Sequence, residues 1–100
     1  MPLYLCYCID RPGTDALRNS VRPEHMAYLE TRDELVLGGA KQSEEGESGG
    51  GSAFLVNVPD RAAALAFING DPFTKADLFD SITVTRVRKG FWHPERAVDA

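Results

Sequence analysis

The sequence predicts an α+β domain of the ferredoxin-like class, in which a four-stranded antiparallel sheet carries two helices on one face. Three observations support this prediction. Four β-rich segments and two helical segments follow one another in the order βαββαβ, no segment is repeated, and a length of 100 residues suits one domain. Hydrophobic residues make up 43% of the chain and charged residues 26%, which are ordinary values for a globular protein and exclude a disordered one.

The first strand is predicted over residues 3–9 (LYLCYCI), which are apolar on both faces and typical of a strand covered on both sides. Cys6 and Cys8 lie two positions apart in it, so their side chains are about 6.6 Å apart on one face, too far for a disulfide. A Cys-x-Cys metal site would need further ligands, and the sequence arranges none at the spacing of a zinc site. We therefore expect two buried thiols and no metal.

The first helix is predicted over residues 16–32, after a break at RPGTD in which Thr14 or Asp15 can cap it. Its apolar face is marked at steps of three and four residues by Leu17, Val21, His25, Tyr28 and Leu29. Pro23 either kinks this helix or starts a second one. Because the apolar spacing continues past the proline, we favour one kinked helix.

The rest of the chain completes the βαββαβ order. We expect a second strand at 34–41, a polar glycine-rich loop at 42–51, a third strand at 52–58, a second helix at 59–69 and a fourth strand at 80–89. Asp60 can cap the second helix at its start, and Asn69 with Gly70 can end it. The domain is therefore predicted at residues 1–90, followed by a C-terminal tail at 91–100.

Two helices can cover only one face of this sheet. The first strand and Val87 in the fourth strand nevertheless place apolar side chains on the other face as well. A second copy of the same chain is the simplest partner that could cover them. The sequence therefore predicts a homodimer.

Charge and hydropathy argue against several classes of partner. The net charge is −4, and the basic residues are scattered, with only RVRK at 86–89 forming a short run, which disfavours a nucleic-acid surface. No apolar run approaches the roughly 20 residues of a membrane span. The N-terminal segment also lacks the basic and small-residue features of a signal peptide. We therefore expect a cytoplasmic protein that binds neither nucleic acid nor membrane.

Four segments resemble the YciI-like (YCII-related) protein family. They are RPEHMAYL in the first helix, LVLGGA in the second strand, GSAFLV at the start of the third and GDPFTKADLFDSITV near the end, in the family's order over nearly the whole chain. The resemblance implies a dimeric α/β-barrel structure and a His-Asp dyad as the active site. It also implies similarity to a branch that dehydrochlorinates a chlorinated hydroxyhydroquinone. One departure is Gly39-Ala40, where family members often have Gly-Pro. It loosens a pocket wall and leaves the identity of the substrate open, but it does not affect the dyad.

The resemblance assigns roles to particular residues. The dyad falls on His25 of RPEH and Asp71 of GDPF. Pro72 would fix the loop that presents the aspartate. Ser52, from the GS that opens the third strand, and Arg18, seven residues before the histidine, would contact the ligand.

The chemistry of these residue types also fits acid–base catalysis independently of the resemblance. Imidazole is the side chain whose ordinary protonation equilibrium suits proton abstraction near pH 7. A carboxylate bonded to one ring nitrogen fixes the tautomer and leaves the other nitrogen as the base. Arg18 and His25 are two helical turns apart and share a face, so the arginine could hold an anionic oxygen while His25 takes a proton.

Each candidate also has a purely structural interpretation, which the residues alone leave open. His25 can be a core histidine, and Asp71 can be a helix cap. Capping is compatible with orienting His25, because a carboxylate has two oxygens. Ser52 can simply end the glycine-rich loop, and Arg18 can be a solvated surface residue. Arg22 is a weaker candidate for a ligand contact.

The sequence as a whole predicts a small-molecule enzyme that performs elimination or isomerisation on a hydroxylated aromatic compound or a small acid, with no cofactor. His25 is the base, Asp71 orients it, and Arg18 and Ser52 hold the substrate. The alternative is a non-catalytic dimeric module that binds a metabolite or a protein partner. A His25 ring nitrogen within about 3.2 Å of Asp71, beside an open cavity, would favour the enzyme. His93, the other histidine, lies in the tail and gives little support to a two-histidine metal site.

Overall fold

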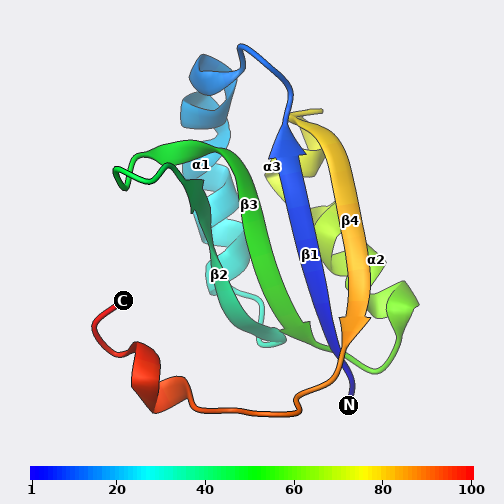
Figure 1. Cartoon of the computed structure of the whole chain (residues 1–100). Coiled ribbons are helices and arrows are strands. Elements are labelled where there is room, and N and C mark those ends of the chain that lie inside the picture. Colours follow the sequence, from blue (N-terminus) through cyan, green and yellow to red (C-terminus); the bar gives the residue numbers. More distant parts are fainter.

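The computed structural model describes residues 1–100, which form one sheet with helices packed on it (Figure 1). The elements are β1 (Leu3–Asp10), α1 (Asp15–Glu30), β2 (Leu35–Gln42), β3 (Ser48–Asn57), α2 (Arg61–Gly70), α3 (Pro72–Lys75), β4 (Phe79–Val87) and the 3-10 helix η1 (Pro94–Ala97). The strands pair antiparallel in the order β2-β3-β1-β4, and α1, α2 and α3 all lie on one face of the sheet. The predicted ferredoxin-like class is confirmed.

Alternation along β1 decides which side chains enter the core. Tyr4, Cys6, Cys8 and Asp10 point toward the helices and are buried. The register places Phe54 of β3 directly beside Cys6, and burial of a side chain of this size contributes roughly 1.5–3 kcal/mol. Both thiols are free and enclosed in this layer, as expected from the sequence.

Helix α1 runs through Pro23 without a break, as the apolar spacing predicts. The predicted side-chain cap is wrong. Thr14 stands at the N-cap position, but its hydroxyl donates to the carbonyl of Arg11 at 2.6 Å and does not cap the helix, and Asp15 makes no hydrogen bond with its side chain. Neither α1 nor any other helix has the length and hydropathy of a transmembrane span.

The predicted glycine-rich loop is wrong in its second half. Residues 48–51 form the first part of β3, and only residues 43–47 turn between β2 and β3. Backbone pairing explains the difference, because Gly51 pairs with Ile9 of β1. A β-carbon on Gly51 would collide with the carbonyl oxygen of Cys8, so the glycine permits two strands to approach closely.

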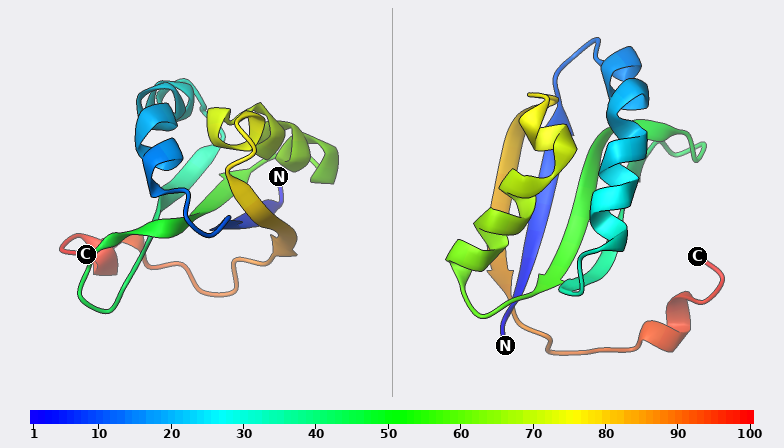
Figure 2. Two further views of the ribbon diagram at one scale, coloured as in Figure 1. Left: turned by 90° about the horizontal axis from the view of Figure 1, so that it is seen from above. Right: turned by 180° about the vertical axis from the view of Figure 1, so that it is seen from behind.

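The opposite face of the sheet carries apolar side chains that no other element covers. Leu5 and Tyr7 of β1 and Leu37 of β2 are 38%, 39% and 69% exposed. Figure 2 shows that the tail leaves β4 on this side of the molecule, away from the helices. Residues 94–97 form a 3-10 helix in the tail, to which the sequence assigns no structure. A hollow of about 680 Å³ opens between this sheet face and Trp92.

Candidate functional site

Three consecutive residues, Gly70, Asp71 and Pro72, build the junction between α2 and α3. At Gly70, the last residue of α2, a β-carbon would lie 2.6 Å from the hydroxyl of Tyr28, so a side chain there would force Tyr28 to move. Pro72 disfavours helical backbone at the residue before it, and Asp71 is extended, with φ −66° and ψ 129°. Pro72 then starts α3 at a position where its missing N–H has no cost. The tripeptide therefore sets Asp71 between two helices.

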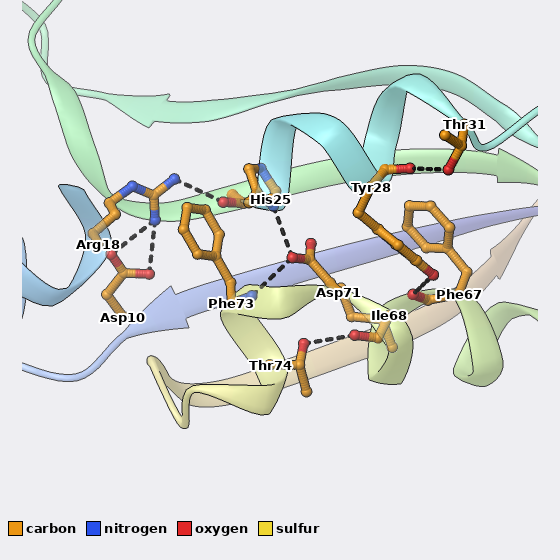
Figure 3. Close-up of polar contacts among 11 residues, drawn as sticks. Asp10, Arg18, His25, Tyr28, Thr31, Phe67, Ile68, Asp71, Phe73 and Thr74 are labelled. Atoms are coloured by element: carbon orange, nitrogen blue, oxygen red, sulfur yellow. Dashed lines mark hydrogen bonds and ion pairs between the residues drawn. The ribbon is translucent and has the colours of Figure 1, made fainter. Parts of the chain in front are cut away.

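Asp71 contacts His25 through one carboxylate oxygen. Its Oδ1 lies 2.7 Å from His25 Nδ1 and accepts the backbone N–H of Phe73 at 2.9 Å, which caps α3 (Figure 3). From the sequence we expect capping and orienting of the histidine to be compatible, and in the structure Oδ1 alone makes both contacts. Oδ2 is buried and has no hydrogen-bond partner.

His25 has one ring nitrogen engaged and one free. An ionised Asp71 can only accept hydrogen bonds, so a neutral His25 donates from Nδ1 and keeps its lone pair on Nε2. Nε2 makes no hydrogen bond with the chain and is not among the buried unpaired atoms, so it retains access to solvent. A buried imidazole held in this way has the arrangement of a general base.

The Phe73 ring holds the imidazole in place. His25 stacks on it with ring centroids 3.8 Å apart and an interplanar angle of 14°. The guanidinium carbon of Arg18 lies 4.7 Å from the centre of the same ring. Figure 3 shows the phenyl ring between the side chains of Arg18 and His25. Aromatic and cation–π contacts of this kind each contribute about 0.5–1.5 kcal/mol, so Phe73 restricts the orientation of both side chains.

Arg18 is held by partners within the chain. Its Nη1 donates to both oxygens of Asp10 at 3.0 and 2.8 Å, and its Nη2 donates to Ser52 Oγ at 2.8 Å. All three residues are buried. The charge of Arg18 is therefore compensated inside the protein, and the two predicted ligand residues, Arg18 and Ser52, bind to each other.

A cavity of about 240 Å³ opens between α1 and β2, and Phe73 of α3 forms part of its lining. It is lined by Arg18, Asn19, Arg22, His25, Met26, Leu29, Gly38, Gly39, Ala40, Ser48 and Phe73. Its volume lies below the roughly 300–1,000 Å³ of sites for drug-sized ligands, so it suits a single small ring or a short acid. The larger hollow on the opposite sheet face contains no histidine or carboxylate and is the weaker candidate for chemistry.

The predicted site residues lie in two bonded groups on the same side of the sheet, but not all of them reach the cavity. His25 and Arg18 line it, whereas Ser52 is 1% exposed and lies behind Arg18. Sequence reasoning missed Asp10 and Phe73. Asp10 carries a usable signal, because it continues the inward-facing alternation of β1. Phe73 directly follows Asp71-Pro72, but the sequence does not show what its ring contacts.

The two thiols are not candidates for a nucleophile at neutral pH. Burial raises the pKa of Cys6 to about 11. Burial also raises the pKa of Cys8 to about 12, and the nearby negative charges of Asp71 and Asp10 act in the same direction. Because the thiolate is the reactive form, both side chains remain structural near pH 7.

Comparison with known proteins shows the family of the chain and a solved structure with clear sequence similarity. The model of the YCII-related domain matches residues 2–88. A solved structure of 5-chloro-2-hydroxyhydroquinone dehydrochlorinase (TftG) from Burkholderia phenoliruptrix AC1100, in complex with 2,5-dihydroxybenzoquinone, is 30% identical in sequence. The match has a TM-score of 0.78 and covers 88% of this chain and 95% of that one. No curated protein sequence is similar enough to match the chain.

Two more distant structures share the fold alone. An antibiotic biosynthesis monooxygenase is 15% identical with a TM-score of 0.56, over 88% of this chain and 97% of its own. A protein of Mycobacterium tuberculosis, Rv0793, is 14% identical with a TM-score of 0.50, over 88% of this chain and 94% of its own. These likenesses support the ferredoxin-like fold and carry no information on activity.

Proposed function

The chain belongs to the YCII-related domain family, and on that premise we propose that it is a small-molecule enzyme that performs acid–base chemistry without a cofactor. The reaction is elimination, such as loss of HCl, or isomerisation of a hydroxylated aromatic compound or a small acid. The observation that carries the proposal is the 2.7 Å contact between His25 Nδ1 and Asp71 Oδ1 beside a cavity. The similarity to a dehydrochlorinase supports elimination as the reaction class.

His25 is the base in this proposal. Nε2 accepts a proton from an acidic group of the substrate, while Nδ1–H remains bonded to Asp71, whose negative charge stabilises the imidazolium that forms. In an elimination, the electrons left by the proton form a new double bond, and chloride leaves with the electron pair of the C–Cl bond. Proton transfer to a positioned side chain contributes roughly 10²–10⁴-fold in rate.

The other predicted site residues act in support. Pro72 fixes the backbone that presents Asp71. Arg18 contributes an edge to the cavity and packs against Phe73, and Ser52 holds the guanidinium in that position. In this proposal the pair shapes the site that a substrate enters.

The direct test is chloride release from 5-chloro-2-hydroxyhydroquinone, measured without oxygen because such substrates oxidise in air. We expect turnover by the wild type and a loss of at least roughly 10²-fold in kcat for His25→Gln. His93→Gln is the matched control, because that histidine is exposed in the tail, and it should keep the wild-type rate. If the wild type converts neither this compound nor chlorine-free hydroxylated aromatics, the enzyme proposal is wrong and the non-catalytic binding module is favoured.

We also propose that two copies of the chain pair through the open sheet face. The apolar side chains of β1 and β2 on that face lie outside the core cluster, and no helix covers them. A second copy presents the same apolar surface, so a two-fold interface would bury both at once.

Sedimentation equilibrium tests this assembly. The wild type should have about twice the mass of one chain, and Leu5→Glu should shift it toward the monomer. Leu65→Glu is the matched control, because Leu65 is 37% exposed, close to the 38% of Leu5, but lies on α2 on the covered side. A monomeric wild type, or dissociation of both variants alike, would exclude pairing through this face.

A further inference from the structure

Helix α1 presents a continuous row of side chains to the cavity. Arg22 lies at the centre of that row, four residues after Arg18 and three before His25. Residues at these spacings are neighbours on a helix, with Cβ atoms about 5–6 Å apart. A group bound at Arg22 is therefore one helical turn from the imidazole, a separation that a single substituted ring can span.

The two arginines of this row differ in how their charge is compensated. Arg18 is buried and paired with Asp10 at 2.8 Å, so the pair contributes no net charge to the cavity. Arg22 is exposed and makes no ion pair and no hydrogen bond with its side chain. Its helical neighbours at three and four residues are Asn19, Arg18, His25 and Met26, and none of these is acidic. Arg22 is thus the lining residue with an uncompensated positive charge.

The opposite wall leaves room for a ligand beside Arg22. Gly38 and Ala40 of β2 face the helices, and neither has a side chain that could fill the cavity. Gly38 cannot carry a larger residue freely, because a β-carbon would lie 3.1 Å from the Phe54 ring. The cavity therefore has one wall without large side chains, formed by β2, and on the α1 wall a guanidinium one helical turn from His25.

We propose that Arg22, and not Arg18, binds the negatively charged oxygen of the substrate, and that the natural ligand is a small anionic ring compound or short acid. This inference rests on the proposed function of the same site and adds the charge of its substrate. A guanidinium binds a carboxylate or an ionised ring hydroxyl by charge-assisted hydrogen bonds. Its two free N–H edges would orient the ring so that another acidic proton faces His25.

Binding of two quinones tests the proposal. The anionic probe is 2,5-dihydroxybenzoquinone, whose acidic hydroxyls are ionised at neutral pH, and the neutral probe is 2,5-dimethoxybenzoquinone, which has the same ring and no acidic hydroxyl. Calorimetric titration should show that the wild type prefers the anionic probe. Arg22→Gln should weaken binding of that probe at least roughly 10-fold while leaving the neutral probe unaffected, and Arg22→Lys should recover part of the loss. Arg96→Gln, which removes the same charge from the tail, is the control and should bind as the wild type does.

Three outcomes would overturn the proposal. They are equal affinity of the wild type for the two probes, equal affinity of Arg22→Gln and Arg96→Gln for the anion, and no binding of the anion by the wild type. The proposed function is judged separately, by chloride release and its loss in His25→Gln. Turnover with an unchanged KM in Arg22→Gln would reject the anion site alone, whereas anion binding through Arg22 without any turnover would reject the enzyme alone.

Discussion

Asp10 and Asp71 are both buried carboxylates on the helix-covered side of the sheet, but their hydrogen bonding is different. Both oxygens of Asp10 accept from the permanently charged Arg18. Asp71 uses Oδ1 for His25 and for the N–H of Phe73, and its Oδ2 has no partner. The Asp10–Arg18 pair is closed, because its two charges already compensate each other. The Asp71–His25 pair is open, because His25 can gain a proton, and Asp71 can then stabilise the positive charge that forms during a reaction.

Breaking the closed pair should have the largest effect on stability. Asp10→Ala leaves the buried Arg18 without its counter-charge, and we expect the free energy of unfolding to fall by about 3–5 kcal/mol, measured by urea denaturation. The double variant Asp10→Leu/Arg18→Met removes both charges and should recover most of this loss. A loss below about 1 kcal/mol in the single variant would contradict the burial of Arg18. It would instead favour the alternative from the sequence analysis, in which Arg18 is a solvated surface residue.

Changing the open pair should affect activity more than stability. Asp71→Asn keeps an oxygen that can cap α3 through the Phe73 N–H but removes the negative charge beside His25. We expect kcat to fall by roughly 10²-fold, while the free energy of unfolding changes by less than about 2 kcal/mol.

Nitrogen-15 NMR of the imidazole measures the effect of Asp71→Asn on the His25 tautomer without a substrate. In the wild type, His25 should show a protonated Nδ1 and an unprotonated Nε2, and in Asp71→Asn the two tautomers should mix. Identical ¹⁵N shifts in the two proteins would show that Asp71 does not select the tautomer, and its role would be that of a helix cap only.

The smallest effect concerns the thiols next to these pairs. The pKa values of Cys6 and Cys8, raised by burial to about 11 and 12 from an ordinary 9.0, mean that the unfolded chain loses thiol protons at a lower pH than the folded chain. Their contribution to stability is complete below about pH 9 and is lost as pH rises toward 11 and 12. The urea midpoint should therefore fall above pH 9, and this fall should shrink in Cys6→Val/Cys8→Val. The partly buried Tyr28, whose pKa is also raised by burial, contributes in the same direction in both proteins. An equal fall in the two proteins would contradict the assigned burial of the thiols.

Much of the fold could be predicted because it depends on local patterns. Neighbouring residues determine the period-two alternation of the strands and the period-3.6 spacing of α1. They also determine the cap at Asp60, whose carboxylate accepts from the N–H of Ala63 at 2.9 Å. The start of β3 could not be predicted in this way. Ser48 and the glycines at 49–51 favour a loop by composition, and only the pairing of Gly51 with Ile9 and of Ser48 with Gln42 places them in a strand.

The candidate site also combines features that local sequence predicts with contacts that it does not predict. Local chemistry places His25 on the inner face of a helix and Asp71 before a proline, and a sequence resemblance connects the two across 46 positions. The sequence does not reveal that Arg18 donates a hydrogen bond to Ser52, nor that Asp10 compensates the charge of Arg18. These contacts join residues that are distant in the chain, so they depend on strand register and helix packing.

The sequence by itself determined the order of the elements, the apolar face of α1 and the residue types available for acid–base chemistry, because each depends on side chains a few positions apart. Tertiary structure alone decided which charges are compensated. Arg18 and Arg22 are one turn apart on the same helix and identical as side chains, yet one is enclosed by Asp10 and Ser52 and the other faces the cavity. That distinction arises because packing α1 on the sheet brings β1 and β3 to Arg18 and leaves Arg22 beside the glycines of β2.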